Sequence, residues 1–148
     1  MIDVSCGLIL NNQYDVLMTL RPPDKLRPNM WEMPGGKREG VETDQDCLAR
    51  ELREELGVIV DVHPRLIATD TFEWDDARNP GEFMLVRCNL YRAVIKAGNP
   101  QPLEAAGLAH YDMTYALRHV PMCPSAYKFY PFVVRYINAL KKRADELR

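Results

Sequence analysis

Long apolar runs are missing from this chain of 148 residues. No run approaches the roughly 18 apolar residues that a membrane-spanning helix needs. The first ten residues contain no lysine or arginine, so the basic segment that opens a signal peptide is missing too. We therefore expect no membrane span, no signal peptide and no membrane among the partners.

A large charge of either sign is also missing. The 19 lysines and arginines nearly balance the 21 aspartates and glutamates, which leaves a net charge of −2. Such a charge gives no strong field to attract a polyanion. We therefore expect no duplex nucleic acid as a partner.

The chain also lacks cysteines at paired spacings. The four cysteines, at positions 6, 47, 88 and 123, make no C-x-x-C pair, and their spacings fit no zinc pattern. Cys6, Cys47 and Cys88 fall within expected helices or strands and are typical of small core residues. Reduced thiols predict a cytoplasmic protein.

What the chain does contain is typical of one globular domain. Its length is sufficient for a proper hydrophobic core, and 47% hydrophobic with 27% charged residues is an ordinary composition. We found no internal repeat or low-complexity segment. We predict a single domain over residues 1–148.

The most informative stretch is WEMPGGKREGVETDQDCLARELREELGV, residues 31–58. Thr43 is a good helix N-cap, and Gly57 is suited to the left-handed residue that ends a helix. These two signals predict a helix from Asp44 to Leu56. Its leucines at positions 48, 52 and 56 share one face, which we expect in the core.

Three glutamates, Glu51, Glu54 and Glu55, adjoin that apolar face in an arc of about 100°. Most clusters of like charge are solvated surfaces, and this arc alone would be interpreted in that way. However, Gly35 and Gly36 nearby would let backbone approach a ligand closely. Carboxylates gathered beside such a turn are typical of Mg²⁺ sites that also bind phosphates.

Residues 36–58 resemble the Nudix box, G-x5-E-x7-R-E-U-x-E-E-x-G-U, in which U is a bulky aliphatic residue. All nine fixed positions are filled: Gly36, Glu42, Arg50, Glu51, Leu52, Glu54, Glu55, Gly57 and Val58. The resemblance implies an α/β fold, a Nudix-type α/β/α sandwich with a mixed β-sheet between helices. It also implies Mg²⁺-dependent hydrolysis of a diphosphate, with Mn²⁺ as the alternative ion.

The same resemblance assigns candidate roles to individual residues. Gly36, Glu51, Glu54 and Glu55 are the candidate metal-binding residues. Arg50 is the candidate residue that orients the box glutamates, and Glu42 fits a supporting role. The general base would be Glu51 or a glutamate from a later loop.

Glu104 is that later candidate, because many family members carry a glutamate six residues before a tryptophan. Here His110 replaces the tryptophan and Gly107 lies midway, which puts the correspondence in doubt. His110 itself is either a substrate contact or a structural histidine. Glu104 is therefore kept as one candidate for a catalytic carboxylate.

The segment from Arg21 to Asn29 contains three prolines and three basic residues, so we expect a loop. It is either a substrate loop or a solvated connector. Arg21, which ends an expected strand, is its best-placed cation. Arg21, Gly35, Gly36 and Lys37 are the candidate substrate-binding residues, although Lys37 also fits a solvated surface lysine.

Other segments predict the remaining elements. Residues 4–10 and 15–20 predict a hairpin, and residues 58–67, 69–74, 82–93 and 108–111 predict further strands, with 72–74 paired to 84–86. Residues 113–119 and 125–147 predict helices. Trp74 is either a cross-strand aromatic or a residue that stacks on a purine.

We expect a small-molecule nucleotide substrate and a monomer or homodimer. The chain most resembles the MutT-type branch, which cleaves a (deoxy)nucleoside triphosphate to monophosphate and pyrophosphate, with removal of damaged nucleotides as one role. The alternatives are another diphosphate (a nucleotide sugar, ADP-ribose, a dinucleoside polyphosphate or capped RNA) and a non-catalytic nucleotide-sensing module. The loop at residues 121–125, PMCPS, offers no amide for an oxidised guanine.

Overall fold

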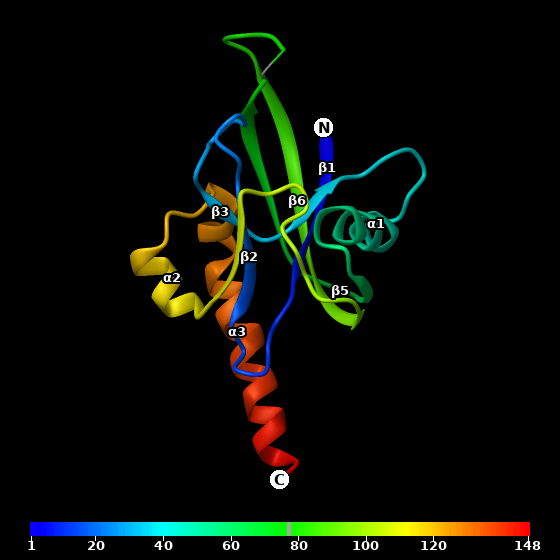
Figure 1. Cartoon of the computed structure of the whole chain (residues 1–148), viewed down its shortest axis with the longest axis vertical. Coiled ribbons are helices and arrows are strands. Elements are labelled where there is room, and N and C mark those ends of the chain that lie inside the picture. The colour runs from blue at the N-terminus through cyan, green and yellow to red at the C-terminus, as the bar shows by residue number, and fades with distance from the viewer. Residues whose placement is uncertain (77) are drawn as a thin grey trace.

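The computed structural model describes residues 1–76 and 78–148. Its elements, in chain order, are β1 (Ile2–Leu8), β2 (Val16–Leu20), β3 (Trp31–Glu32), β4 (Gly35–Lys37), α1 (Asp44–Leu56), β5 (Ile59–Asp75), β6 (Phe83–Ala97), β7 (Gly107–Tyr111), α2 (Met113–His119) and α3 (Pro124–Glu146). Helix α1 lies on one side of the strands, and α2 and α3 lie on the other (Figure 1). The expected α/β/α sandwich is confirmed.

The strands form two sheets. The first has the order β4-β1-β6-β5, and the second has the order β3-β2-β7. Strands β1 and β6 are parallel, whereas the other pairs are antiparallel, so the first sheet is mixed. Strand β5 continues through both segments expected after α1, with irregular register between Val62 and Ala68. The expected pairing of residues 72–74 with 84–86 is confirmed.

The hairpin expected from residues 4–10 and 15–20 is wrong. Strand β1 pairs with β4 on one edge and β6 on the other, and β2 pairs with β3 and β7. Both edges of each strand are therefore used by other partners. The two segments meet in a single antiparallel bridge between Leu10 and Val16, in which the Leu17 N–H donates to the Ile9 carbonyl at 2.9 Å, among the residues that the structure describes.

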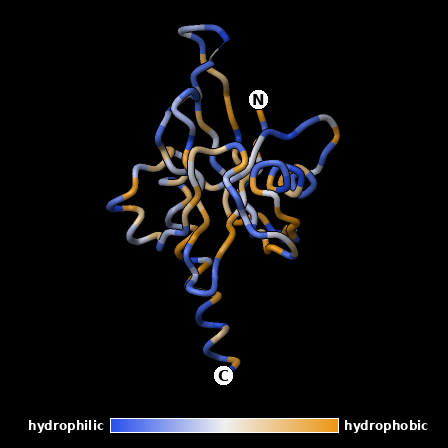
Figure 2. Tube along the Cα trace, in the orientation of Figure 1, coloured by the Kyte–Doolittle hydropathy of each residue, from blue (hydrophilic) through white to orange (hydrophobic). Residues whose placement is uncertain are grey.

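Alternating side chains along the strands build two cores. Val16 and Met18 belong to the core under α2 and α3, whereas Leu17 between them belongs to the core under α1. This period of two is the ordinary geometry of a strand. In Figure 2 the strands carry much of the hydrophobic colour, while hydrophilic residues prevail at the C-terminal end of α3, which extends away from the sheets.

Local caps explain the bounds of α1. The Thr43 hydroxyl accepts a hydrogen bond from the Asp46 N–H at 3.1 Å, and Gly57 is left-handed with φ 70°. The helix therefore spans the predicted residues. Both ends depend on residues adjacent in sequence, as capping requires.

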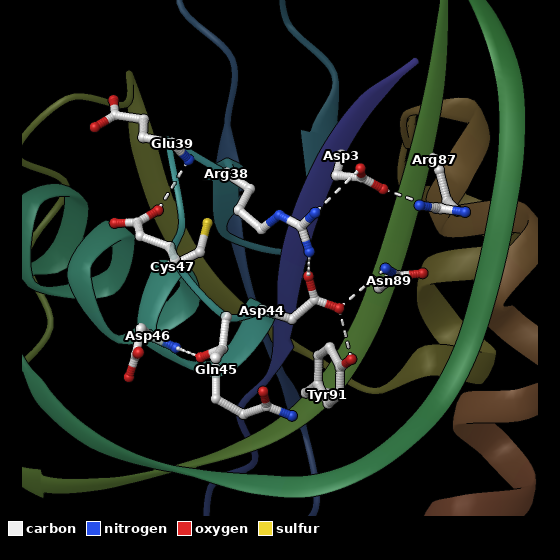
Figure 3. A network of polar contacts seen from close by, with 12 residues as sticks. Asp3, Arg38, Glu39, Asp44, Gln45, Asp46, Cys47, Arg87, Asn89 and Tyr91 are labelled. Atoms are coloured by element: carbon white, nitrogen blue, oxygen red, sulfur yellow. Dashed lines mark hydrogen bonds and ion pairs between the residues drawn. The ribbon is translucent and has the colours of Figure 1, made fainter.

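The start of α1 is also fixed to the sheet through Asp44 (Figure 3). Its carboxylate accepts hydrogen bonds from the Tyr91 hydroxyl at 2.7 Å and the Asn89 side chain at 3.1 Å, both from β6. Arg38, from the loop before the helix, pairs with the other oxygen at 3.1 Å. The direction of the glutamate helix relative to the sheet is thus set at its first residue.

Replacing Leu52 by alanine should lower the free energy of unfolding by about 2–5 kcal/mol, because this fully buried side chain would leave a cavity under α1. Leu103, which is 60% exposed, provides the matched control. Its alanine variant should change stability by no more than about 0.5 kcal/mol. Urea unfolding followed by circular dichroism measures both, and equal losses would contradict the assigned core.

Candidate active site

The three helix glutamates lie against the Gly35–Lys37 strand. A Cβ atom built on Gly36 would overlap the Glu51 carboxylate, and one built on Gly35 would overlap the Ser5 carbonyl. The Gly35 N–H donates to Glu55 Oε2 at 3.3 Å. Gly36 therefore permits close approach of β4 to the Glu51 carboxylate, and Gly35 permits close approach of β4 to the backbone of β1.

Arg50 links the acidic residues around the helix. Its guanidinium donates to Glu51 Oε1 at 3.0 Å, to Glu54 Oε2 at 3.3 Å and to both carboxylate oxygens of Glu42. It also donates to the Lys37 carbonyl at 3.1 Å. One planar cation thus holds the loop, the strand and the helix in a fixed arrangement.

The contacts of Glu42 match its expected supporting role. The Arg50 guanidinium and the Glu39 N–H, which donates at 2.9 Å, lower the pKa of Glu42 to about 2. This carboxylate is therefore ionised, and both of its oxygens accept hydrogen bonds. It ties the loop before α1 to Arg50.

Glu51 and Glu55 have the opposite electrostatic situation. Burial, followed by the charges of Glu51 and Glu32, raises the pKa of Glu55 to about 8. Burial also raises the pKa of Glu51, against the opposing effect of Arg50. A nearby cation lowers the pKa of a carboxylate. The raised pKa values therefore indicate that Glu51 and Glu55 have too little positive charge around them.

The donor set fits a hard divalent cation. Glu51, Glu54 and Glu55 each use one oxygen in the contacts above, and among the described residues the second oxygen of each accepts no hydrogen bond. Free carboxylate oxygens are the ligands that Mg²⁺ and Mn²⁺ prefer. An ion there would also supply the positive charge that the raised pKa values indicate is lacking.

The carboxylates of Glu51, Glu54 and Glu55 do not converge on one point. Within residues 1–76 and 78–148, no group of three acidic, histidine or cysteine side chains is arranged to hold an ion. Arg50 holds Glu54 and Glu51, while Glu55 turns toward Gly35. Glu54, 49% exposed, has room to change rotamer.

Glu104 lies near this cluster, although its role stays a prediction. Its charge acts on both Glu51 and Glu55. With Glu32 and Glu55 it lines a cavity of about 220 Å³ that Arg21 also borders. The loop after β6 therefore adds a carboxylate to the helix glutamates.

A larger, mainly apolar cavity of about 490 Å³ adjoins this acidic one, and Arg21 and Glu32 line both. Its apolar walls include Phe72, Trp74 and Phe129. Arg21 pairs with Glu32 at 3.3 Å, so an ion pair lies where the two cavities meet. A molecule with a flat apolar part and an anionic part would match this combination.

The remaining predicted residues divide between the site and the surface. Lys37 borders the larger cavity, whereas His110 is exposed on β7. Trp74 lines the larger cavity with the Arg27 guanidinium 4.5 Å and the Arg21 guanidinium 5.4 Å from its ring centre. The loop from Arg21 to Asn29 therefore contributes to the cavity wall.

Glu32 was not among the predicted site residues. The sequence gave no sign that Glu32 would pair with Arg21. The residues from α3 that line the larger cavity were missed as well. They come from a helix whose only sequence signal is its apolar stripe.

The structure contains no helix long and apolar enough to cross a membrane, within the residues it describes.

Comparison with known proteins identifies relatives of this chain. The model of the family described as NUDIX domain matches residues 2–131. An 8-oxo-dGTP diphosphatase of Proteus vulgaris is 34% identical over 83 residues, which cover 56% of this chain and 73% of that protein. A CTP pyrophosphohydrolase of Escherichia coli K12 is 40% identical over 58 residues, 39% of this chain and 42% of its own length.

A solved structure supports the fold. The MutT protein from Methanosarcina mazei Go1 superposes with a TM-score of 0.74 over 95% of each chain, at 20% identity.

Replacing Gly36 by alanine should weaken Mn²⁺ binding by at least about tenfold, because the new Cβ displaces the Glu51 carboxylate. In Gly107→Ala the added Cβ meets its nearest atoms at 3.5–3.6 Å, so this variant is the matched control. Calorimetric titration with Mn²⁺ measures both. Unchanged affinity in the Gly36 variant would contradict Glu51 as a metal-binding residue.

The metal-free protein should become less stable as the pH rises from 5 to 8. The folded state keeps the Glu55 proton up to a pKa of about 8, whereas the unfolded chain loses it near the ordinary 4.5. The free energy of unfolding should fall by up to about 1.4 kcal/mol per pH unit relative to Glu55→Gln.

Urea unfolding in a chelating buffer, with wild type and Glu55→Gln compared at each pH, measures this difference. Equal pH dependence in the two proteins would show that Glu55 has an ordinary pKa.

Proposed function

The chain belongs to the NUDIX domain family, and on that premise we propose that it hydrolyses a (deoxy)nucleoside triphosphate to monophosphate and pyrophosphate. The observation that carries this proposal is the junction of the two cavities at Arg21 and Glu32. A nucleobase fits the apolar cavity while the phosphates lie over Gly35, Gly36 and the helix glutamates.

The names of the relatives support the same class of substrate. They are an 8-oxo-dGTP diphosphatase, a CTP pyrophosphohydrolase and, in Klebsiella pneumoniae, the nucleoside triphosphatase NudI. Together these names point to nucleoside triphosphates and to no single base. Removal of a damaged nucleotide is one role within this class, carried out in the cytoplasm, a compartment that suits four free cysteines.

Mg²⁺ is the ion that we propose, with Mn²⁺ as the alternative, held by Gly36, Glu51, Glu54 and Glu55. When bound, it would supply positive charge to the substrate phosphates and lower the pKa of the attacking water. The free oxygens and the raised pKa of Glu55 support this assignment.

The chain's own residues supply the rest of the mechanism. Glu51 or Glu104 accepts the proton of the attacking water, since both carboxylates lie in the acidic cluster. Arg21 and Lys37 offer positive charge to the substrate phosphates at the cavity borders. Arg50 is a positioning residue that acts through its contacts with Glu51 and Glu54.

A hydrolysis screen with Mg²⁺ tests the proposal. Nucleoside triphosphates, oxidised nucleotides, nucleotide sugars, ADP-ribose and dinucleoside polyphosphates are incubated separately, and the products are resolved by chromatography. We expect triphosphates to yield monophosphate and pyrophosphate. Turnover of the diphosphate-linked compounds alone, or nucleotide binding without any turnover, would overturn the proposal.

Replacing Glu54 by glutamine should lower kcat at saturating Mg²⁺ by about 100-fold or more, since it removes a metal-binding charge. The fold should persist, because this side chain is 49% exposed. Glu146→Gln, at the far end of α3, is the matched control and should keep wild-type turnover. Near-normal turnover in Glu54→Gln would exclude its role in metal binding.

A further inference from the structure

Two thiols meet in the wall of the larger cavity. Cys6 Sγ and Cys88 Sγ lie 2.8 Å apart, although 82 residues separate them in the sequence. They come from β1 and β6, the two inner strands of the four-stranded sheet. None of the catalytic or substrate-binding roles proposed above uses either thiol.

The strand register keeps these thiols together. Cys6 lies opposite Leu90 and Val4 lies opposite Cys88, so the two cysteines occupy diagonal positions. Both belong to the core under α2 and α3, which places them on the same face of the sheet. Two hydrogen-bonded inner strands cannot separate without disrupting the sheet.

The cavity gives small molecules a route to this pair. Both cysteines line the cavity of about 490 Å³, and Cys6 keeps 9% of its surface exposed. Cys47 belongs to α1, where it is fully buried and its thiol lies 3.5 Å from the Gly36 carbonyl. The cavity therefore reaches Cys6 and Cys88, whereas Cys47 does not line it.

We propose that Cys6 and Cys88 form a modification site that a peroxide converts to an intramolecular disulfide. One thiol, as its thiolate, attacks a peroxide oxygen and becomes a sulfenic acid, and the peroxide leaves as water or an alcohol. The second thiol then attacks the sulfenic sulfur and water is released. In total, two thiols are oxidised, one peroxide is reduced, and an S–S bond replaces two S–H bonds.

The geometry favours the second step. A disulfide has an S–S length of about 2.04 Å, so the sulfurs need to approach by only about 0.8 Å. The hydrogen bond to Cys88 and burial raise the pKa of Cys6 well above its ordinary value. The reaction is therefore slow at neutral pH and suits exposure to excess oxidant.

Cys123 provides an internal control because it lines the same cavity. Its thiol donates to Glu32 Oε2 at 3.4 Å, and burial raises its pKa to about 12. Among the described residues its thiol contacts this carboxylate and no second thiol, so it has no partner for an intramolecular disulfide. The proposal does not depend on which reaction the chain catalyses.

The experiment treats the reduced whole chain with hydrogen peroxide, blocks the remaining thiols with an alkylating reagent, and analyses intact mass and proteolytic peptides. We expect a loss of two hydrogen masses, two blocked thiols and a peptide pair linked through Cys6 and Cys88. Cys123→Ala should give the same linked pair, whereas Cys6→Ser and Cys88→Ser, which each lack one of the two sulfurs, should abolish it.

Peptide mapping of the wild type decides the question even if a variant fails to fold. A different cysteine pair, a disulfide between two chains, or oxidation of Cys6 and Cys88 to sulfinic or sulfonic acids without a linked peptide would overturn the proposal. Alkylation of all four thiols after the peroxide treatment would overturn it as well.

Discussion

The guanidinium of Arg50 is the interaction on which the site depends. It donates to Glu42, Glu51 and Glu54 and to the backbone of β4. Lysine has a single nitrogen and cannot make this set of contacts, whereas the five donors of arginine can. The helix glutamates therefore hold a fixed relation to Gly35 and Gly36 without converging on one another.

The rest of the fold supplies the platform for that arrangement. Asp44 fixes the start of α1 to β6, and the leucine face of the helix packs on the same sheet. Because β1 and β4 are paired in that sheet, Gly36 is brought beside Glu51. The proposed chemistry thus uses free carboxylate oxygens on a rigid support, with Arg50 offsetting only part of their charge.

Sequence reasoning succeeded where the determinants are local. Both ends of α1 follow from Thr43 and Gly57, and the three box glutamates lie on this helix. It failed for the hairpin of β1 and β2, because strand partners distant in sequence compete for their edges. The thiol pair of Cys6 and Cys88 also joins segments 82 residues apart, which no local pattern reveals.

The most direct test of this account is a crystal soaked with Mn²⁺ and measured for anomalous scattering. The account predicts a peak within about 2.5 Å of carboxylate oxygens from at least two of Glu51, Glu54 and Glu55, with Arg50 still bound to Glu42. A peak elsewhere, or no peak at a saturating concentration of Mn²⁺, would contradict the assignment of this helix face as the metal site.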